Sequence, residues 1–136
     1  MMEIIIVIVL VSIAAGFGIP SYRQAILRTR ESQAIVNLEL IHAAANFYRN
    51  QAGGFLAGSA EDIDFINQNF SLSIIETNDI VYQYDSSDPD LFDIKAEVLD
   101  SNGGSFFDID MNQSPISATN PCCDPGTGGC VSLPEC

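Results

Sequence analysis

The stretch that decides the fold runs from Glu3 to Tyr22 and reads EIIIVIVLVSIAAGFGIPSY. Between Met1 and Ile19 every side chain is apolar except those of Glu3 and Ser12. An acidic side chain costs about 2.5–3.5 kcal/mol at the centre of a membrane helix and less near its end. We therefore expect Glu3 to find a cationic partner in a protein assembly, or else to reach water at a membrane surface.

Residues 1–22 are long enough to cross a bilayer as one helix, since about 20 helical residues span its hydrocarbon core. They are predicted to form an apolar transmembrane helix. A cleaved signal peptide is disfavoured, because the apolar segment continues into a helical pattern without a break.

Residues 23–52 are predicted to continue the same helix in amphipathic form. Apolar residues recur at steps of three, four and seven, at Leu27, Ala34, Leu38, Ile41, Ala45 and Tyr48. A second apolar face carries Ile35, Val36, Leu40, Ala44 and Phe47. Gly53 and Gly54 are expected to end the helix. Such a rod would be about 75 Å long, so its first half must project from a domain of this size.

The N-terminal segment closely resembles the type IV pilins and the type II secretion pseudopilins. The resemblance rests on Glu3, Pro20 and Tyr22 with their spacing, on the aliphatic run between them, and on the sequence Ile-Pro-Ser-Tyr at 19–22. It covers about the first 50 residues. It implies a subunit that polymerises through its N-terminal helix, with Glu3 paired to the α-amine of an adjacent subunit's N-terminus.

Family precursors carry a short basic leader, and the mature chain usually opens with an N-methylated phenylalanine two residues earlier than this chain begins. We therefore expect the chain to be mature or slightly truncated. The resemblance also implies three partners besides other copies of the chain: the pilus assembly machinery, a prepilin peptidase and the inner membrane. The subunit would lie in that membrane before assembly and outside the cell in the filament.

The resemblance implies roles for two groups of residues in this segment. Packing in the filament core is expected of Ile4, Ile5, Val7, Ile8, Val11 and Tyr22. Loss of helical structure on packing, which would lengthen the rod, is expected around Ser12, Gly16, Gly18 and Pro20. Proline removes a backbone donor, and each glycine lowers helix propensity by about 1 kcal/mol relative to alanine. The alternative is a modest kink in a membrane helix.

Beyond the long helix, residues 53–79 are predicted to form a connecting loop with a short helix, capped by the sequence at 59–62 and ending near Asn67. Residues 80–112 alternate apolar and polar side chains in three runs, which predicts an antiparallel meander. Turns are expected at 85–90 and 102–104. The apolar face of this sheet needs a cover, and the second half of the long helix provides one, giving an α+β head.

Residues 113–136 are predicted to form a cysteine-rich loop closed by disulfides. It contains Cys122, Cys123, Cys130 and Cys136. A bridge between the adjacent cysteines would be strained, so two pairings stay open: 122 with 136 and 123 with 130, or 122 with 130 and 123 with 136. A zinc site is the runner-up. Many type IV pilins close this region by disulfide, whereas major pseudopilins more often use calcium, which favours a pilin.

The charge of the chain is strongly uneven. The formal net charge is −13, and Lys95 is the only basic residue beyond the first 50. An acidic head of this kind repels phosphates, which argues against a nucleic-acid partner. The early arginines are expected to contact lipid headgroups, or to pair with Glu31 and Glu39 of neighbouring helices.

Neither a cofactor nor an enzymatic activity is predicted. Four aspartates cluster in one loop, at 85, 88, 90 and 93. Asp108, Asp110 and Asn112 follow the 1, 3, 5 spacing that opens a calcium loop, but the glycine and the glutamate that complete such a loop are missing. The single histidine, His42, lies inside the helical pattern, where packing is a commoner role than catalysis.

The sequence thus predicts a type IV pilin-like structural subunit of an extracellular filament. Two alternatives are the major pseudopilin of a type II secretion system and a single-pass, membrane-anchored binding module.

Overall fold

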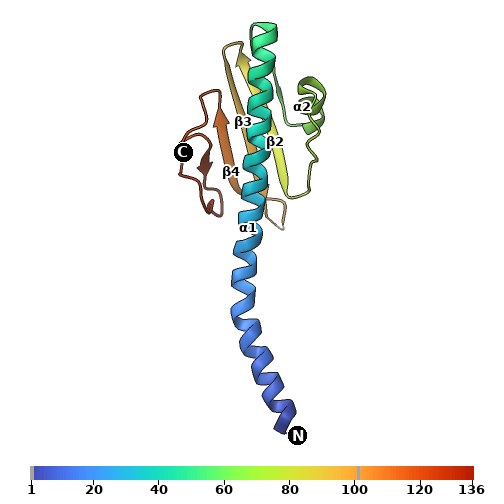
Figure 1. Cartoon of the computed structure of the whole chain (residues 1–136), viewed down its shortest axis with the longest axis vertical. Helices are drawn as coiled ribbons and strands as arrows, with labels where there is room; N and C mark the ends of the chain where they lie inside the picture. The colour runs from blue at the N-terminus through green and yellow to red at the C-terminus, as the bar shows by residue number, and fades with distance from the viewer. Residues whose placement is uncertain (1, 101) are drawn as a thin grey trace.

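The structure is a computed structural model that describes residues 2–100 and 102–136; for residues 2, 3 and 14–21 it describes the backbone alone. One helix, α1 (Met2–Ala52), runs the length of the molecule, and its first half projects from the head (Figure 1). The helix ends as predicted at the glycine pair. Gly53 adopts a positive φ of 83°, and its N–H donates to the carbonyl of Arg49 at 2.8 Å.

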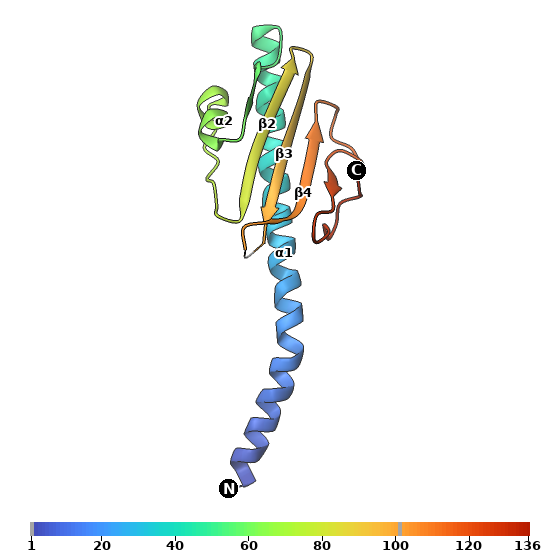
Figure 2. The ribbon, with the colours of Figure 1, turned by 180° about the vertical axis from the view of Figure 1, so that it is seen from behind.

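The head is a five-stranded antiparallel sheet in the order of the chain. Its strands are β1 (Gly58–Ala60), β2 (Ile80–Asp88), β3 (Leu91–Leu99), β4 (Ser105–Asn112) and β5 (Cys122–Asp124). The second half of α1 crosses one face of this sheet, and the opposite face is open (Figures 1 and 2). The α+β class is therefore confirmed.

The core forms where the apolar stripe of α1 packs against the apolar face of the sheet. From α1, fully buried side chains come at steps of four, three and four, at Ala34, Leu38, Ile41 and Ala45. From the three long strands, every second side chain is buried: Ile80, Tyr82, Tyr84, Phe92, Ile94, Ala96, Val98, Phe107, Ile109 and Met111. These are the residues whose alternation predicts the strands, so the meander over 80–112 is confirmed.

The short helix α2 (Ile63–Phe70) begins later than the sequence suggests. Asp62 is its N-cap, and the carboxyl oxygen accepts the N–H of Asp64 at 2.8 Å. The predicted cap, Ser59, instead lies in β1 and pairs with Asp85 of β2. The predicted helix start was therefore wrong, because an aspartate one turn later caps the helix directly.

Two further corrections concern the sheet. The expected turn at 85–90 is shorter, because β2 continues through a bulge to Asp88 and only Pro89 and Asp90 form the turn. The segments predicted as loops, 53–79 and 113–136, each contain a short strand, β1 and β5, which extend the two edges of the meander.

Candidate functional site

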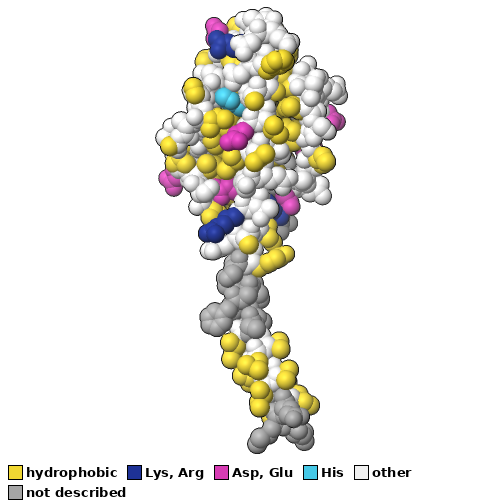
Figure 3. All heavy atoms as spheres, viewed as in Figure 1, with side chains coloured by type: hydrophobic (Ala, Val, Ile, Leu, Met, Phe, Trp, Pro, Cys, Tyr) yellow, Lys and Arg dark blue, Asp and Glu magenta, His cyan; other side chains and the backbone are white. Residues whose placement is uncertain are grey.

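The projecting half of α1 contains an exposed apolar segment, residues 4–13, which from here on we call the rod. Its large apolar side chains are 51–65% exposed, including the predicted packing residues Ile4, Ile5, Val7, Ile8 and Val11. Tyr22 is 68% exposed. Figure 3 shows these yellow side chains gathered along the rod. Side chains of this kind gain free energy when they leave water, so the rod is a surface suited to association.

The other residues of the projecting half to which the resemblance gives a role are only partly described. The Ser12 hydroxyl donates to the carbonyl of Ile8 at 2.7 Å, within the helix. For Glu3, Gly16, Gly18 and Pro20 the structure describes the backbone alone, and this backbone is helical at all four positions. Across the described residues, no helix has a stretch both long and apolar enough to cross a membrane.

The head leaves the second apolar face of α1 only partly covered, since Ile35 and Ala44 of that face are half-buried against the core. Val36, Leu40 and Phe47 are about half exposed or more, whereas the opposite stripe is buried against the sheet. Figure 3 shows apolar side chains on the head face that α1 crosses. This outer face of α1 is therefore a second exposed apolar surface on the same helix.

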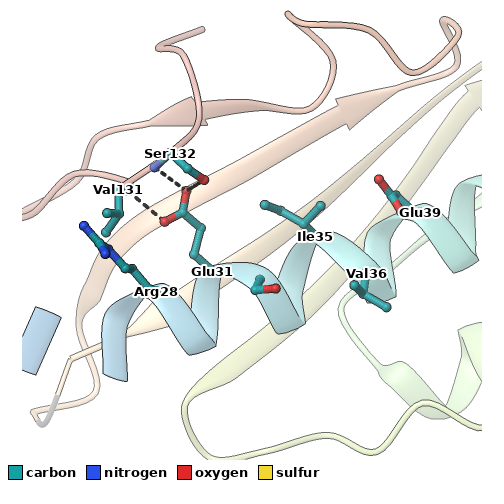
Figure 4. A pocket seen from close by; sticks show the side chains of 8 residues that line it. Arg28, Glu31, Ile35, Val36, Glu39, Val131 and Ser132 are labelled. Atoms are coloured by element: carbon teal, nitrogen blue, oxygen red, sulfur yellow. Dashed lines mark hydrogen bonds between the residues drawn. The ribbon is translucent and has the colours of Figure 1, made fainter. Parts of the chain in front are cut away.

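A buried carboxyl group joins α1 to the C-terminal loop. Glu31 is 1% exposed, and its two carboxyl oxygens accept four hydrogen bonds from three consecutive residues. Figure 4 shows the carboxyl group turned towards Val131 and Ser132 of the C-terminal loop. The N–H groups of Val131, Ser132 and Leu133 donate at 2.8, 2.9 and 3.2 Å, and the Ser132 hydroxyl donates at 2.8 Å. We call this arrangement the Glu31 clasp. Sequence reasoning missed it, because nothing local marks a helical glutamate as the acceptor for a loop 100 residues away.

Two disulfides hold the loop that the clasp binds. Cys122 pairs with Cys136 and Cys123 with Cys130, so the first of the two open pairings is the one that forms. Cys123 is buried in the core, where β5 pairs with β4. The second bridge therefore ties the residue just before Val131 to the sheet.

Two of the arginines, Arg30 and Arg49, form ion pairs within their own chain. Arg30 pairs with Asp79 at 2.9 Å and donates to the carbonyl of Leu99 at 3.3 Å. Arg49 pairs with Asp90 at 3.3 Å. The expectation that Glu31 pairs with an arginine of a neighbouring helix is wrong, since the clasp occupies both of its oxygens.

Acidic side chains line the open face of the sheet around one cation. Lys95 on β3 lies 3.0 Å from Asp108 and 3.8 Å from Asp110, both on β4. Burial lowers the pKa of Lys95, but the hydrogen bond to Asp108 and the charge of Asp110 raise it further, so the net pKa is above its ordinary value. Among the described residues, no three His, Cys, Asp or Glu side chains are grouped as a metal site would require.

His42 is packed into the head. Its ring is 7% exposed and lies 5.5 Å from the ring of Phe92. Nε2 lies 3.1 Å from the carbonyl of Ser114, and Nδ1 lies 3.3 Å from the side-chain amide of Asn46. These contacts give both ring nitrogens a structural partner.

No protein-family model, curated protein or solved structure matches this chain.

Proposed function

We propose that this protein is the structural subunit of an extracellular type IV pilus-like filament, polymerising through its N-terminal helix. The observation that carries the proposal is the exposed apolar rod on a helix whose other half packs along one stripe against a folded head. Rod packed against rod in several copies would remove these side chains from water, and the acidic heads would face outward.

Glu3 has a specific role in this proposal. Surrounded by apolar side chains in an assembled core, its carboxylate requires a cation, and the α-amine of an adjacent copy is the partner that the resemblance to pilins implies. This pairing would fix the axial register between neighbouring rods. Before assembly the subunit would be held at the inner membrane through residues 1–22, and its role would be structural rather than enzymatic.

Replacing Glu3 by alanine tests this role. A Glu3→Ala chain should keep the fold of its head and the affinity of its rod for detergent or membrane, yet assemble poorly, because the register is no longer set by charge. The measurement is the polymer fraction by sedimentation, with electron microscopy of the pellet. Filaments of Glu3→Ala at the wild-type yield would show that the proposed role of Glu3 is wrong.

Electron microscopy of the wild-type chain tests the proposal as a whole. A helical polymer with rods at its axis supports a filament subunit, and filaments extending beyond the cell distinguish a pilus from a pseudopilus. A chain that stays monomeric under all assembly conditions would instead point to a membrane-anchored binding module.

A further inference from the structure

Two tripeptides of the chain match the acceptor pattern for N-linked glycosylation, Asn-x-Ser/Thr with x other than proline. They are Asn69-Phe-Ser71 and Asn112-Gln-Ser114. A pattern this short also arises by chance, so the surroundings of each asparagine have to distinguish them. The sugar is attached to the side-chain nitrogen Nδ2, which must therefore be exposed and available.

Asn69 is unsuited to this chemistry. It lies in the last turn of α2, and its Nδ2 donates to the carbonyl of Phe65 at 2.9 Å. Ser71 is the C-cap of the same helix, with a φ of 54°, and its N–H donates to the carbonyl of Asn67. Attachment of a sugar at Asn69 would thus compete with the contacts that end α2.

Asn112 has the opposite surroundings. It is the last residue of β4 and is exposed. Its side-chain oxygen Oδ1 accepts the N–H of Ser114 at 2.9 Å, which folds the tripeptide into a turn. Across the part of the chain that the structure describes, no hydrogen bond engages Nδ2 of Asn112. The attacking nitrogen is therefore available, and the serine of the pattern lies close to it.

Two buried side chains hold the backbone of this tripeptide from inside the head. Asn120 donates through Nδ2 to the carbonyls of Asn112 and Ser114, at 3.3 and 2.7 Å, and its Oδ1 accepts the N–H of Asn112 at 3.1 Å. Nε2 of His42 lies 3.1 Å from the same Ser114 carbonyl. Since these contacts use the backbone alone, the side chains of Asn112 and Ser114 remain exposed.

There is also room for a sugar beside Asn112. A cavity of about 300 Å³ opens there, and Asp93 and Asp110 line it. Carboxylates accept hydrogen bonds from hydroxyl groups such as those of a sugar. Figure 2 shows that β4 ends on the side of the head away from the projecting half of α1. A sugar at Asn112 would therefore leave the rod uncovered.

We propose that Asn112 is a site of N-linked glycosylation. The sugar donor would be a lipid pyrophosphate-linked oligosaccharide, and the enzyme a membrane oligosaccharyltransferase. In the transfer, Nδ2 of Asn112 forms a bond to C1 of the sugar and loses one proton, while the bond from C1 to the pyrophosphate oxygen breaks and the lipid pyrophosphate leaves. The two disulfides are typical of the oxidising compartments outside the cytoplasm in which such transfer takes place.

Mass spectrometry of the full chain, purified from the cells of its own organism, tests the proposal. We expect the peptide that contains Asn112 to carry the added mass of an oligosaccharide, and the peptide that contains Asn69 to carry none. A chain without a glycan at Asn112, or with equal modification at Asn69, would overturn the proposal.

Three variants made in the same cells show whether the tripeptide directs the attachment. Asn112→Gln and Ser114→Ala should each lose the added mass, whereas Asn69→Gln is the matched control and should keep it. Ser114→Ala retains the backbone contacts to His42 and Asn120, so its melting temperature should equal that of the wild type. A glycan that persists in Ser114→Ala would contradict the assignment.

This proposal goes beyond the filament function and fails separately from it. A chain that is glycosylated at Asn112 but forms no polymer would overturn the filament function alone. A chain that polymerises without a glycan at Asn112 would overturn the glycosylation site alone.

Discussion

Glu31 shows how one residue can join two distant parts of a chain. Burying a carboxyl group is costly unless its oxygens find donors, and the C-terminal loop supplies four. In sequence, Glu31 is one of several charged residues on a long helix, which favours an ion pair with an arginine of a neighbouring helix. Its partners depend on where the loop folds, which no local pattern encodes.

Replacing Glu31 by alanine should lower the free energy of unfolding by about 2–4 kcal/mol, because buried N–H donors are left without an acceptor. Urea denaturation with the disulfides intact measures the change. Glu39→Gln on the same helix is the control and should stay within about 0.5 kcal/mol of wild type. Equal midpoints for Glu31→Ala and Glu39→Gln would contradict the importance of the clasp.

Asp110 is a second residue whose surroundings matter, because they shift the pKa of its carboxyl group. Burial raises the pKa of its carboxyl group, and the charge of Lys95 lowers it. The neighbouring acids, among them Asp108 and Asp124, raise it again, so the net pKa lies above the ordinary aspartate value. The folded state therefore binds this proton more tightly than the unfolded state does, and Asp110 reduces stability as pH rises through its folded pKa.

Asp110→Asn should therefore raise the melting temperature at neutral pH, where the wild-type side chain is charged. The difference should vanish well below the ordinary aspartate pKa of about 3.9, where both side chains are neutral. Thermal unfolding followed by circular dichroism across this range gives both values. A variant that is less stable than wild type at pH 7 would mean that the ion pair with Lys95 outweighs burial.

At the level of elements, the sequence predicts the helices and strands that have a regular apolar periodicity and misses those that have none. The long helix and the three central strands follow from apolar residues at helical and alternating spacing. β1 is Gly-Ser-Ala and β5 is Cys-Cys-Asp, and neither contains the β-branched or aromatic residues that mark a strand. They are strands because they pair with β2 and β4, and for β5 also because disulfides hold it there.

The same reasoning applies to the functional surface. Exposure of the rod and of the second face of α1 could be predicted, since a helix with more apolar surface than one small sheet covers must leave some of it open. The Glu31 clasp could not, because it joins residues about 100 apart in sequence. The disulfide pairing was one of two that the cysteine spacing left open.

Removing the bridge between Cys122 and Cys136 tests how far the C-terminal loop depends on covalent closure. The double change Cys122→Ser and Cys136→Ser opens a loop of about 15 residues, which should cost about 3 kcal/mol. Neither cysteine is fully buried, so little core packing is lost with the bridge. Chemical denaturation without reductant measures the loss. An unchanged midpoint would mean that the clasp and the remaining bridge, Cys123–Cys130, position the loop without it.

At the scale of the whole molecule, apolar and acidic surfaces are separated along the chain. All acidic residues except Glu3 lie beyond Tyr22, and the formal net charge is −13. In the proposed filament, rods attract one another in the centre while heads of like charge are held side by side. Assembly is therefore a balance between apolar burial and electrostatic repulsion.

Raising the salt concentration should shift this balance towards polymer, because the screening length falls from about 10 Å at 0.1 M to about 3 Å at 1 M salt. The critical concentration for polymerisation, measured by sedimentation, should fall along the series. Ile8→Lys is the control, since a charge in the rod should prevent assembly at every salt concentration. A critical concentration that rises with salt would contradict this balance.

The continuity of α1 from rod to head has a mechanical consequence. In a fibre built on such rods, a pulling force would travel along the axis of each helix and from rod to rod, without passing through the sheet. The strands lie to one side of the axis of α1, so tension along this axis would not separate them. The elasticity of the fibre would then be set by residues 2–52, which form one continuous helix.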